Sequence, residues 1–124
     1  MKLLTKEIEK KLNKYPFNSQ DGKLGEAEVI VKFFNPVGVG TWFITEAEKQ
    51  DSGKYLFYGY CHLGDDDMAE MGYVSEEELE SIRLPYGLKI ERDMYIKSNT
   101  KLANAIKSSG FKVPSYLIKD NYER

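Results

Sequence analysis

The side chains best suited to chemistry gather around His62, the only histidine of the chain. Asp65, Asp67 and Glu70 follow it closely. Carboxylates with one imidazole would favour a hard cation such as magnesium or calcium. As an EF-hand loop the segment fails, because Glu70 takes the sixth position, where that loop needs glycine. The sequence therefore predicts a solvated acidic loop here and no metal site.

Cys61 and His62 raise the second possibility, a nucleophile beside its base. Cys61 ends a run predicted as a strand and His62 follows it directly, and neighbouring side chains of extended backbone point to opposite faces. Cys61 is therefore predicted to be a small core residue. No Gly-x-Ser-x-Gly motif is present, and Gly38 and Gly40 lack the Gly-Lys-Ser/Thr sequence of a phosphate-binding loop. We predict no enzyme activity and no cofactor, and a hydrolase built on His62 and carboxylates ranks last.

Residues 65–80 carry the strongest charge anomaly of the chain. They hold eight of its 20 acidic residues and none of its 18 basic residues. Glutamates at the start of a helix are favoured by the helix dipole, which accounts for about half of the cluster but not for the aspartate triplet. We predict that this block binds a protein partner with a basic surface. The predicted partner-binding residues are Asp65, Asp66, Asp67, Glu70, Tyr73, Glu76, Glu77 and Glu80.

Aromatic anchors would supply the buried contact area that charge alone does not. The chain has nine tyrosines and one tryptophan. Tyrosine combines a large apolar ring with a polar tip and is frequent at interfaces. Tyr58, Tyr60 and Tyr73 are the predicted anchors because they lie in or beside the acidic block.

A nucleic-acid-binding module is the alternative function. Lysines are frequent in the first helix and the C-terminal part, and exposed tyrosines can stack on bases. Against this reading stands the isoelectric point of about 5.5, well below that of a dedicated nucleic-acid binder. The lysines concerned are Lys6, Lys10, Lys11, Lys14, Lys97, Lys101, Lys107, Lys112 and Lys119.

Length and composition indicate one domain of 124 residues with enough apolar content, 41%, to bury its own core. One cysteine allows no internal disulfide and fits a reducing compartment. The N-terminus lacks the apolar region of a signal peptide, and no apolar run approaches the length of a membrane span. We expect a cytoplasmic protein that does not enter the membrane.

The first half of the chain predicts a helix followed by a three-stranded meander. Leu4, Ile8 and Leu12 recur at helical spacing, and Thr5 is the predicted N-cap. Strands are predicted at 28–34, 41–45 and 55–61 from their β-branched and aromatic residues. Residues 46–53 between the last two strands are predicted to form a charged hairpin loop.

The second half predicts shorter elements. After an extended stretch at 71–74, Ser75 and Glu78 have the spacing of a capping box, and Leu79 gives the following helix its apolar side. Residues 88–96 are predicted to be extended. Thr100 is the predicted cap of a last helix that ends at Gly110. Together these elements predict an α+β fold, an antiparallel sheet of about four to five strands with helices packed against it.

Several of these segments resemble a bacterial family known as domain of unknown function 2958. The most specific is 71–83 (MGYVSEEELESIR), continued at 86–95 (YGLKIERDMY). Further similar pieces are 3–12 (LLTKEIEKKL), 31–36 (VKFFNP), 40–43 (GTWF) and 56–59 (LFYG). The resemblance covers about residues 1–96, and residues 97–124 are interpreted as a C-terminal helical extension.

The resemblance implies a small protein of bacteria, plasmids, phages and other mobile elements, located in the cytoplasm of a bacterial host cell, with no established enzyme activity. Some small proteins similar to the family are linked to inhibition of CRISPR–Cas9. The resemblance therefore suggests an anti-CRISPR accessory protein that binds Cas9 or another CRISPR effector, with the acidic block entering a basic nucleic-acid channel.

Overall fold

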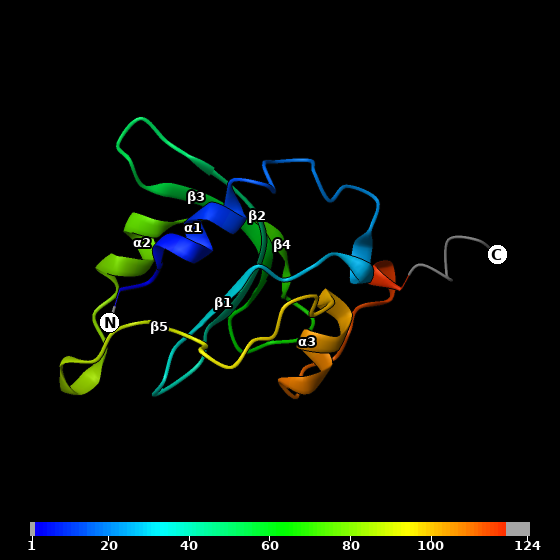
Figure 1. The fold of residues 1–124 in the computed structure, drawn as a ribbon. Coiled ribbons are helices and arrows are strands. Elements are labelled where there is room, and N and C mark those ends of the chain that lie inside the picture. Colours follow the sequence, from blue (N-terminus) through cyan, green and yellow to red (C-terminus); the bar gives the residue numbers. More distant parts are fainter. Residues whose placement is uncertain (1, 119–124) are drawn as a thin grey trace.

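The sheet is the centre of the fold, with helices on both of its sides (Figure 1). The computed structural model describes residues 2–118. Five antiparallel strands follow the order β4-β3-β2-β1-β5, which confirms the predicted meander and α+β fold. The strands are β1 (Val31–Phe34), β2 (Thr41–Lys49), β3 (Tyr55–His62), β4 (Glu70–Ser75) and β5 (Glu91–Arg92). The helices are α1 (Lys6–Leu12), α2 (Glu76–Ser81) and α3 (Leu102–Ser108), with 3-10 turns η1 (Leu24–Glu26), η2 (Pro85–Gly87) and η3 (Ser115–Leu117).

Alternation along β2 divides the core into two clusters, one on each face of the sheet. Trp42 and Ile44 belong to the cluster that also holds Leu12 of α1 and Leu79 of α2. Phe43, which lies between them in the sequence, belongs to the cluster with α3. Because successive side chains of a strand point to opposite faces, α1 and α2 cover one face and α3 covers the other (Figure 1).

The two predicted helix caps at Thr5 and Ser75 are confirmed. The Thr5 hydroxyl accepts a hydrogen bond from the Ile8 N–H at 3.2 Å. Ser75 accepts from the Glu78 N–H at 3.0 Å, and the Glu78 carboxylate accepts from the Ser75 N–H at 2.9 Å. These reciprocal bonds satisfy backbone donors that a helix start leaves free, so α2 begins directly where β4 ends.

The predicted loop at 46–53 is wrong in its first half, because β2 continues to Lys49. Glu46, predicted to lie in this loop, is a strand residue that is only 3% exposed. Its carboxylate accepts hydrogen bonds from the backbone N–H groups of Asn18 and Gln20 at 2.9 and 2.8 Å. A register shift between Ile44 and Glu46 lets the strand continue with this charge inside.

The predictions for 28–34, 88–96 and Thr100 also need correction. The first strand begins only at Val31, and Glu28 forms an isolated bridge with Lys101. Within 88–96, only Glu91–Arg92 pair as a strand. Thr100 does not cap α3, since both its N–H and its hydroxyl donate to the Lys97 carbonyl. The helix begins at Leu102. Gly110 has a positive φ of 85°, as expected for a glycine that follows the end of a helix.

Replacement of Gly59 by alanine is expected to lower the free energy of unfolding by about 3 kcal/mol. A Cβ there would lie 1.9 Å from the carbonyl oxygen of Phe43, so the strand backbone would have to shift. Gly72→Ala is the matched control in the neighbouring strand, because its Cβ would meet nothing within 4 Å. Urea denaturation of both variants checks this, and equal stabilities would contradict the packing described for Gly59.

Candidate protein-binding surface

The acidic block does not form one patch, because β4 runs through its middle. The β3–β4 loop carries one acidic group at the start of β4, and α2 carries the other at its end. A six-residue strand holds the two groups about 17–20 Å apart. The first group is Asp65, Asp66, Asp67 and Glu70, and the second is Glu76, Glu77, Glu78 and Glu80. We call the β4 strand with both groups the acidic-flanked edge.

In the loop group, Asp66 is held by hydrogen bonds to the protein although its side chain is 42% exposed. The Gly64 N–H donates to His62 Nδ1 at 3.2 Å, so Nε2 carries the proton and donates to Asp66 Oδ1 at 2.8 Å. This hydrogen bond and one from the Lys112 N–H lower the pKa of Asp66. The Phe111 ring stacks on the imidazole with centroids 3.8 Å apart. The loop therefore has a fixed anchor on the α3 side of the sheet.

All four members of the loop group are exposed, and Asp65, Asp67 and Glu70 are the three that make no ion pair within residues 2–118. Asp65 Oδ1 accepts from the Asp67 N–H at 2.8 Å, which shapes the turn but leaves the rest of both carboxylates accessible. Negative charge is therefore concentrated at this end of β4.

In the helix group, most glutamates serve the protein itself. Glu76 accepts the Tyr55 N–H at 3.0 Å and lies 3.9 Å from Lys54 Nζ. Glu80 lies 2.8 Å from the same ammonium, which raises the pKa of Lys54. Glu78 completes the capping box. Glu77 is exposed, and its carboxylate makes no hydrogen bond or ion pair within residues 2–118, although its charge acts on Lys54 at longer range.

Of the three predicted aromatic anchors, Tyr73 fits best. It lies on β4 and is 61% exposed. Its ring contacts Tyr58 and Phe17, with centroids 4.9 and 5.3 Å away. Tyr58 is half-buried. Tyr60 was wrongly predicted as an anchor, because it is 0% exposed and packs under α3.

Tyr60→Phe is expected to leave stability unchanged or raise it by about 1 kcal/mol. The Tyr60 hydroxyl is buried and has no hydrogen-bond partner among residues 2–118. Burial, with Tyr116 and Asp66 nearby, raises the pKa of this phenol to about 12. Tyr55→Phe is the control and should cost about 1 kcal/mol, because the Tyr55 hydroxyl donates to Asn13 at 2.7 Å. Thermal unfolding of both variants measures the two effects. A larger loss of stability in Tyr60→Phe than in Tyr55→Phe would contradict the assignment.

Cys61 and His62 point to opposite faces, as predicted. Cys61 packs against the cluster under α1 and α2, whereas His62 stacks under Phe111 on the α3 side. Burial raises the pKa of the Cys61 thiol to about 11, so it is a poor nucleophile at neutral pH. Within residues 2–118, no three His, Cys, Asp or Glu side chains converge on a point that could hold a metal ion.

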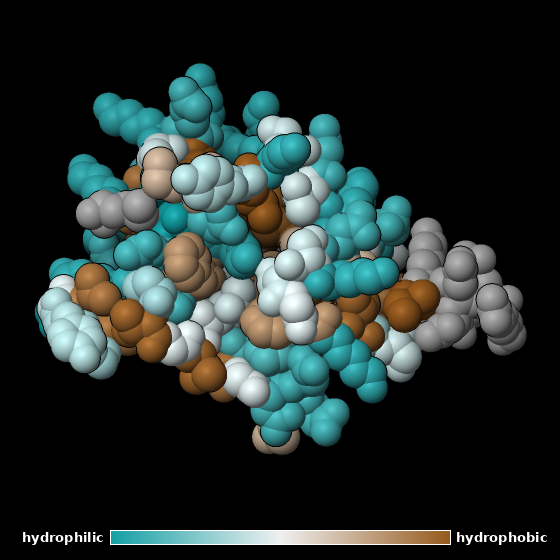
Figure 2. Space-filling view, turned by 90° about the horizontal axis from the view of Figure 1, so that it is seen from below, coloured by the Kyte–Doolittle hydropathy of each residue, from teal (hydrophilic) through white to brown (hydrophobic). Residues whose placement is uncertain are grey.

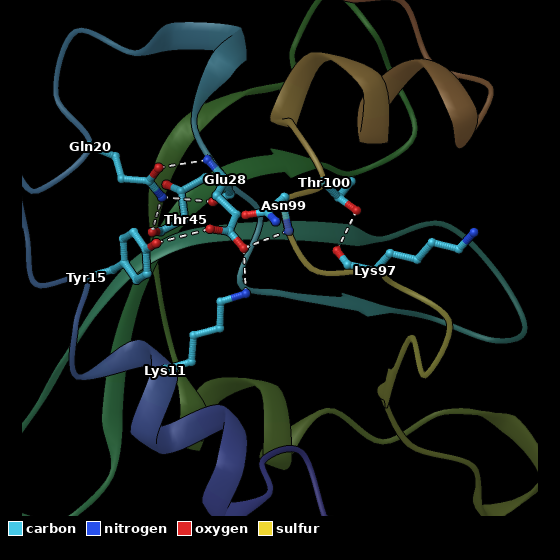
Figure 3. Close-up of polar contacts among 8 residues, drawn as sticks. All are labelled: Lys11, Tyr15, Gln20, Glu28, Thr45, Lys97, Asn99 and Thr100. Carbon is cyan, nitrogen blue, oxygen red and sulfur yellow. Dashed lines mark hydrogen bonds and ion pairs between the residues drawn. The ribbon is translucent and has the colours of Figure 1, made fainter.

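The densest polar network was not predicted from the sequence and centres on Glu28 (Figure 3). Lys11 Nζ lies 2.5 Å from Glu28 Oε2, which also accepts the Asn99 N–H at 2.9 Å. The Tyr15 hydroxyl donates to Oε1 at 3.0 Å. Burial alone would raise the pKa of Glu28, but the Lys11, Asn99 and Tyr15 hydrogen bonds outweigh it, so the pKa is lowered. The network ties α1 to the 97–101 segment.

Gln20 completes this network through the backbone. Its side-chain amide donates to the carbonyls of Glu28 and Thr45, both at 2.8 Å, and its carbonyl accepts the Glu28 N–H at 2.7 Å (Figure 3). Because the Glu28 carboxylate and the Gln20 side-chain amide are bound by the protein, the network is structural rather than an open site.

A groove of about 420 Å³ opens between α1 and residues 92–98. Lys11, Arg92 and Lys97 line it together with apolar residues of β1 and α1. The Arg92 guanidinium donates to the carbonyls of Lys2 and Leu3 at 2.6 and 3.0 Å, so this cation serves to hold the N-terminal segment.

A family model described as Protein of unknown function (DUF2958) matches residues 3–110. The chain belongs to this family. The match continues past residue 96, the expected limit of the family-like core, and includes α3. No curated protein and no solved structure matches the chain. The DUF2958 match includes the whole acidic-flanked edge.

The C-terminal extension expected at 97–124 is described only in part. Residues 97–118 contain α3 and η3, and both contribute buried side chains to the cluster under α3. The expected charged end at 119–124 lies outside the described residues. None of the helices in residues 2–118 is long and apolar enough to cross a membrane.

Proposed function

We propose that this DUF2958 protein is a non-enzymatic accessory protein that binds a basic protein surface through the acidic-flanked edge. The observation that carries the proposal is the exposure of Asp65, Asp67, Glu70 and Glu77 around one exposed aromatic residue, Tyr73. Charge of one sign steers association, and an aromatic ring supplies contact area that is lost from water on binding.

The rest of the visible surface supports a role for charge. On the lower face of the molecule, brown side chains lie in small groups among teal ones (Figure 2). Exposed apolar residues are spread over separate elements, for example Val39 before β2, Met68 in the β3–β4 loop and Met94 after β5. A partner that recognises charge therefore fits this surface better than one that needs a broad apolar patch.

The proposed partner class is a CRISPR effector such as Cas9, in the setting of a phage or another mobile element. Such effectors hold nucleic acid in a positively charged channel, which is complementary to exposed carboxylates. Purified Cas9 with guide RNA is incubated with increasing amounts of this protein, and cleavage of a target plasmid is measured. We expect inhibition at near-stoichiometric amounts that weakens as salt rises.

The matched controls for this assay are two triple variants with the same change in net charge. Asp65→Asn, Asp67→Asn and Glu77→Gln together should abolish inhibition. Glu7→Gln, Glu26→Gln and Glu91→Gln together should leave it intact, because these residues lie outside the acidic-flanked edge. If the first variant still inhibits cleavage, the acidic surface is not the binding surface. If the wild-type protein does not affect cleavage, Cas9 is not the partner.

A nucleic-acid-binding module is the second candidate, favoured by a different segment. Tyr86 and Tyr95 are 93% and 91% exposed, and the exposed lysines Lys89 and Lys97 lie close to them in sequence. Exposed rings with neighbouring cations suit stacking on single-stranded bases. A gel shift of labelled single-stranded DNA by this protein alone, lost in Tyr86→Ala/Tyr95→Ala, would favour this candidate.

A further inference from the structure

The outer edge of β4 is unpaired within residues 2–118. β4 is the first strand in the sheet order and pairs on one side only, with β3. All six of its residues pair with β3 in an unbroken register. Natural edge strands are commonly blunted by proline, lysine or a bulge, because an open edge invites another strand. The sequence of β4, EMGYVS, contains neither proline nor lysine, and its register has no bulge.

The backbone groups that face outward can be identified from the sheet's alternation. The Asn35 N–H donates to the Gly40 carbonyl, and the Asp93 N–H donates to the Lys32 carbonyl. These two bonds show which residues of β1 are hydrogen-bonded to β2 and which to β5. Hydrogen-bonded and non-bonded pairs alternate along antiparallel strands. Followed across the sheet from β1 to β4, this alternation turns Gly72 and Val74 toward β3 and Met71 and Tyr73 outward.

Two side-chain contacts at the ends of the strands agree with this assignment. The Ser75 N–H, next in the outward set, is bound by the Glu78 carboxylate rather than by β3. The Tyr55 N–H, at the β4 side of β3, is bound by Glu76 where β4 has ended. The free donors and acceptors of the edge are therefore the N–H and C=O groups of Met71 and Tyr73.

From this edge we infer that the partner is an extended segment that adds to β4 as a sixth strand and carries basic residues at both of its ends. The inference rests on the proposed function and specifies its mode. Backbone pairing would supply affinity, and the acidic groups at the two ends of β4 would select Lys or Arg about six residues apart. The centre, Met71 to Val74, has no charge, so the middle of the occupant should be uncharged.

Charge also argues against a second copy of this chain as occupant. Two β4 strands pairing with each other would bring the loop group or helix group of one copy beside an acidic group of the other in either direction. Like charges in such positions repel, which disfavours self-pairing. Space does not oppose a foreign strand, because Gly72 leaves one face of the edge open.

The test uses the full chain and a ten-residue peptide with two lysines at each end and the centre Thr-Val-Thr-Val-Thr-Val. Two control peptides replace all four lysines by glutamates, or carry N-methyl groups on every central amide so that neither edge of the peptide strand can donate. Calorimetry should show binding of the lysine-ended peptide, no binding of the glutamate-ended one, and binding at least about tenfold weaker for the N-methylated one.

The matched protein variants are Tyr73→Pro and Tyr73→Ala. Both remove the ring, but only proline removes the outward N–H, a position where an edge strand tolerates proline. Tyr73→Pro should bind the lysine-ended peptide about tenfold more weakly than Tyr73→Ala. If circular dichroism shows that Tyr73→Pro is unfolded, the N-methylated peptide with wild-type protein gives the same comparison.

Three results would overturn the inference. The first is no binding of the lysine-ended peptide by the wild-type protein. The second is equal binding of the N-methylated and unmodified peptides by the wild-type protein, together with loss of binding to both peptides in Asp65→Asn/Asp67→Asn/Glu77→Gln. Basic partners would then bind the acidic surface without strand pairing. The proposed function would stand and the inference would fall. The third is a wild-type protein that sediments as a dimer without peptide while Tyr73→Pro sediments as a monomer. A second copy of the chain would then occupy the edge of β4.

Discussion

Replacing Glu28 by alanine should lower the free energy of unfolding by about 2–3 kcal/mol. The change leaves the Lys11 ammonium, the Tyr15 hydroxyl and the Asn99 N–H without their common acceptor. Breaking a fully buried ion pair costs more, but the Lys11 side chain is 33% exposed, and water compensates part of its loss. Urea denaturation at pH 7 measures the effect.

Glu28→Gln is the matched control because it keeps the size and one acceptor oxygen. It should cost about 1 kcal/mol at pH 7. The pKa of Glu28 is lowered from its ordinary value of 4.5, so its ionised form adds stability above that value. This contribution is lost as pH falls below 4.5 through the folded-state pKa. The stability gap between wild type and Glu28→Gln should therefore shrink from pH 7 toward pH 3, and a gap independent of pH would contradict the ionised network.

Neutralising Asp65, Asp67 and Glu77 should slow association with the lysine-ended peptide by about tenfold or more at low salt. These carboxylates are exposed, so their field reaches an approaching cation. Asn and Gln keep the shape of each side chain, including an acceptor for the Asp67 N–H at position 65. Stopped-flow fluorescence at several salt concentrations measures the rate.

The variant Glu7→Gln/Glu26→Gln/Glu91→Gln controls for net charge. It changes the total charge by the same amount but should keep the wild-type association rate. At high salt the rates of all three proteins should converge, because screening removes long-range steering. Equal slowing by both triple variants would mean that net charge, rather than the acidic-flanked edge, attracts the peptide.

Local patterns predicted the regular elements well where one signal was sufficient. The spacing of Leu4, Ile8 and Leu12 indicated α1, and Ser75 with Glu78 located the start of α2. The strands of the meander followed from runs of β-branched and aromatic residues. In these cases propensity, burial and hydrogen bonding agree, so the tertiary structure had nothing to override.

The misplaced residues are those whose environment is made by distant parts of the chain. Glu46 and Glu28 have charged side chains that normally mark a surface, yet backbone donors from 18–20 and Asn99 satisfy them inside. Tyr60 is buried because α3, far along the sequence, covers it. No local pattern contains these contacts. The one available signal of a buried carboxylate is a glutamate within an otherwise apolar, strand-like run, as at both positions.

The acidic block shows the same limit for the site. The sequence located its charge, and the capping box showed that part of it serves α2. That β4 separates the block into two groups and presents an open edge between them depends on sheet order, which local patterns do not fix. The acidic-flanked edge is therefore a property of the topology rather than of the charge run alone.

The central claim is that a basic partner adds to the outer edge of β4. Hydrogen exchange of the full chain, resolved by NMR with and without the lysine-ended peptide, tests it most directly. The amides of Met71 and Tyr73 should exchange quickly in the free protein and become protected on binding, while those of Gly72 and Val74, bound to β3, change little. Binding that leaves Met71 and Tyr73 unprotected, or protects residues around Lys11 and Lys97 instead, would contradict the account.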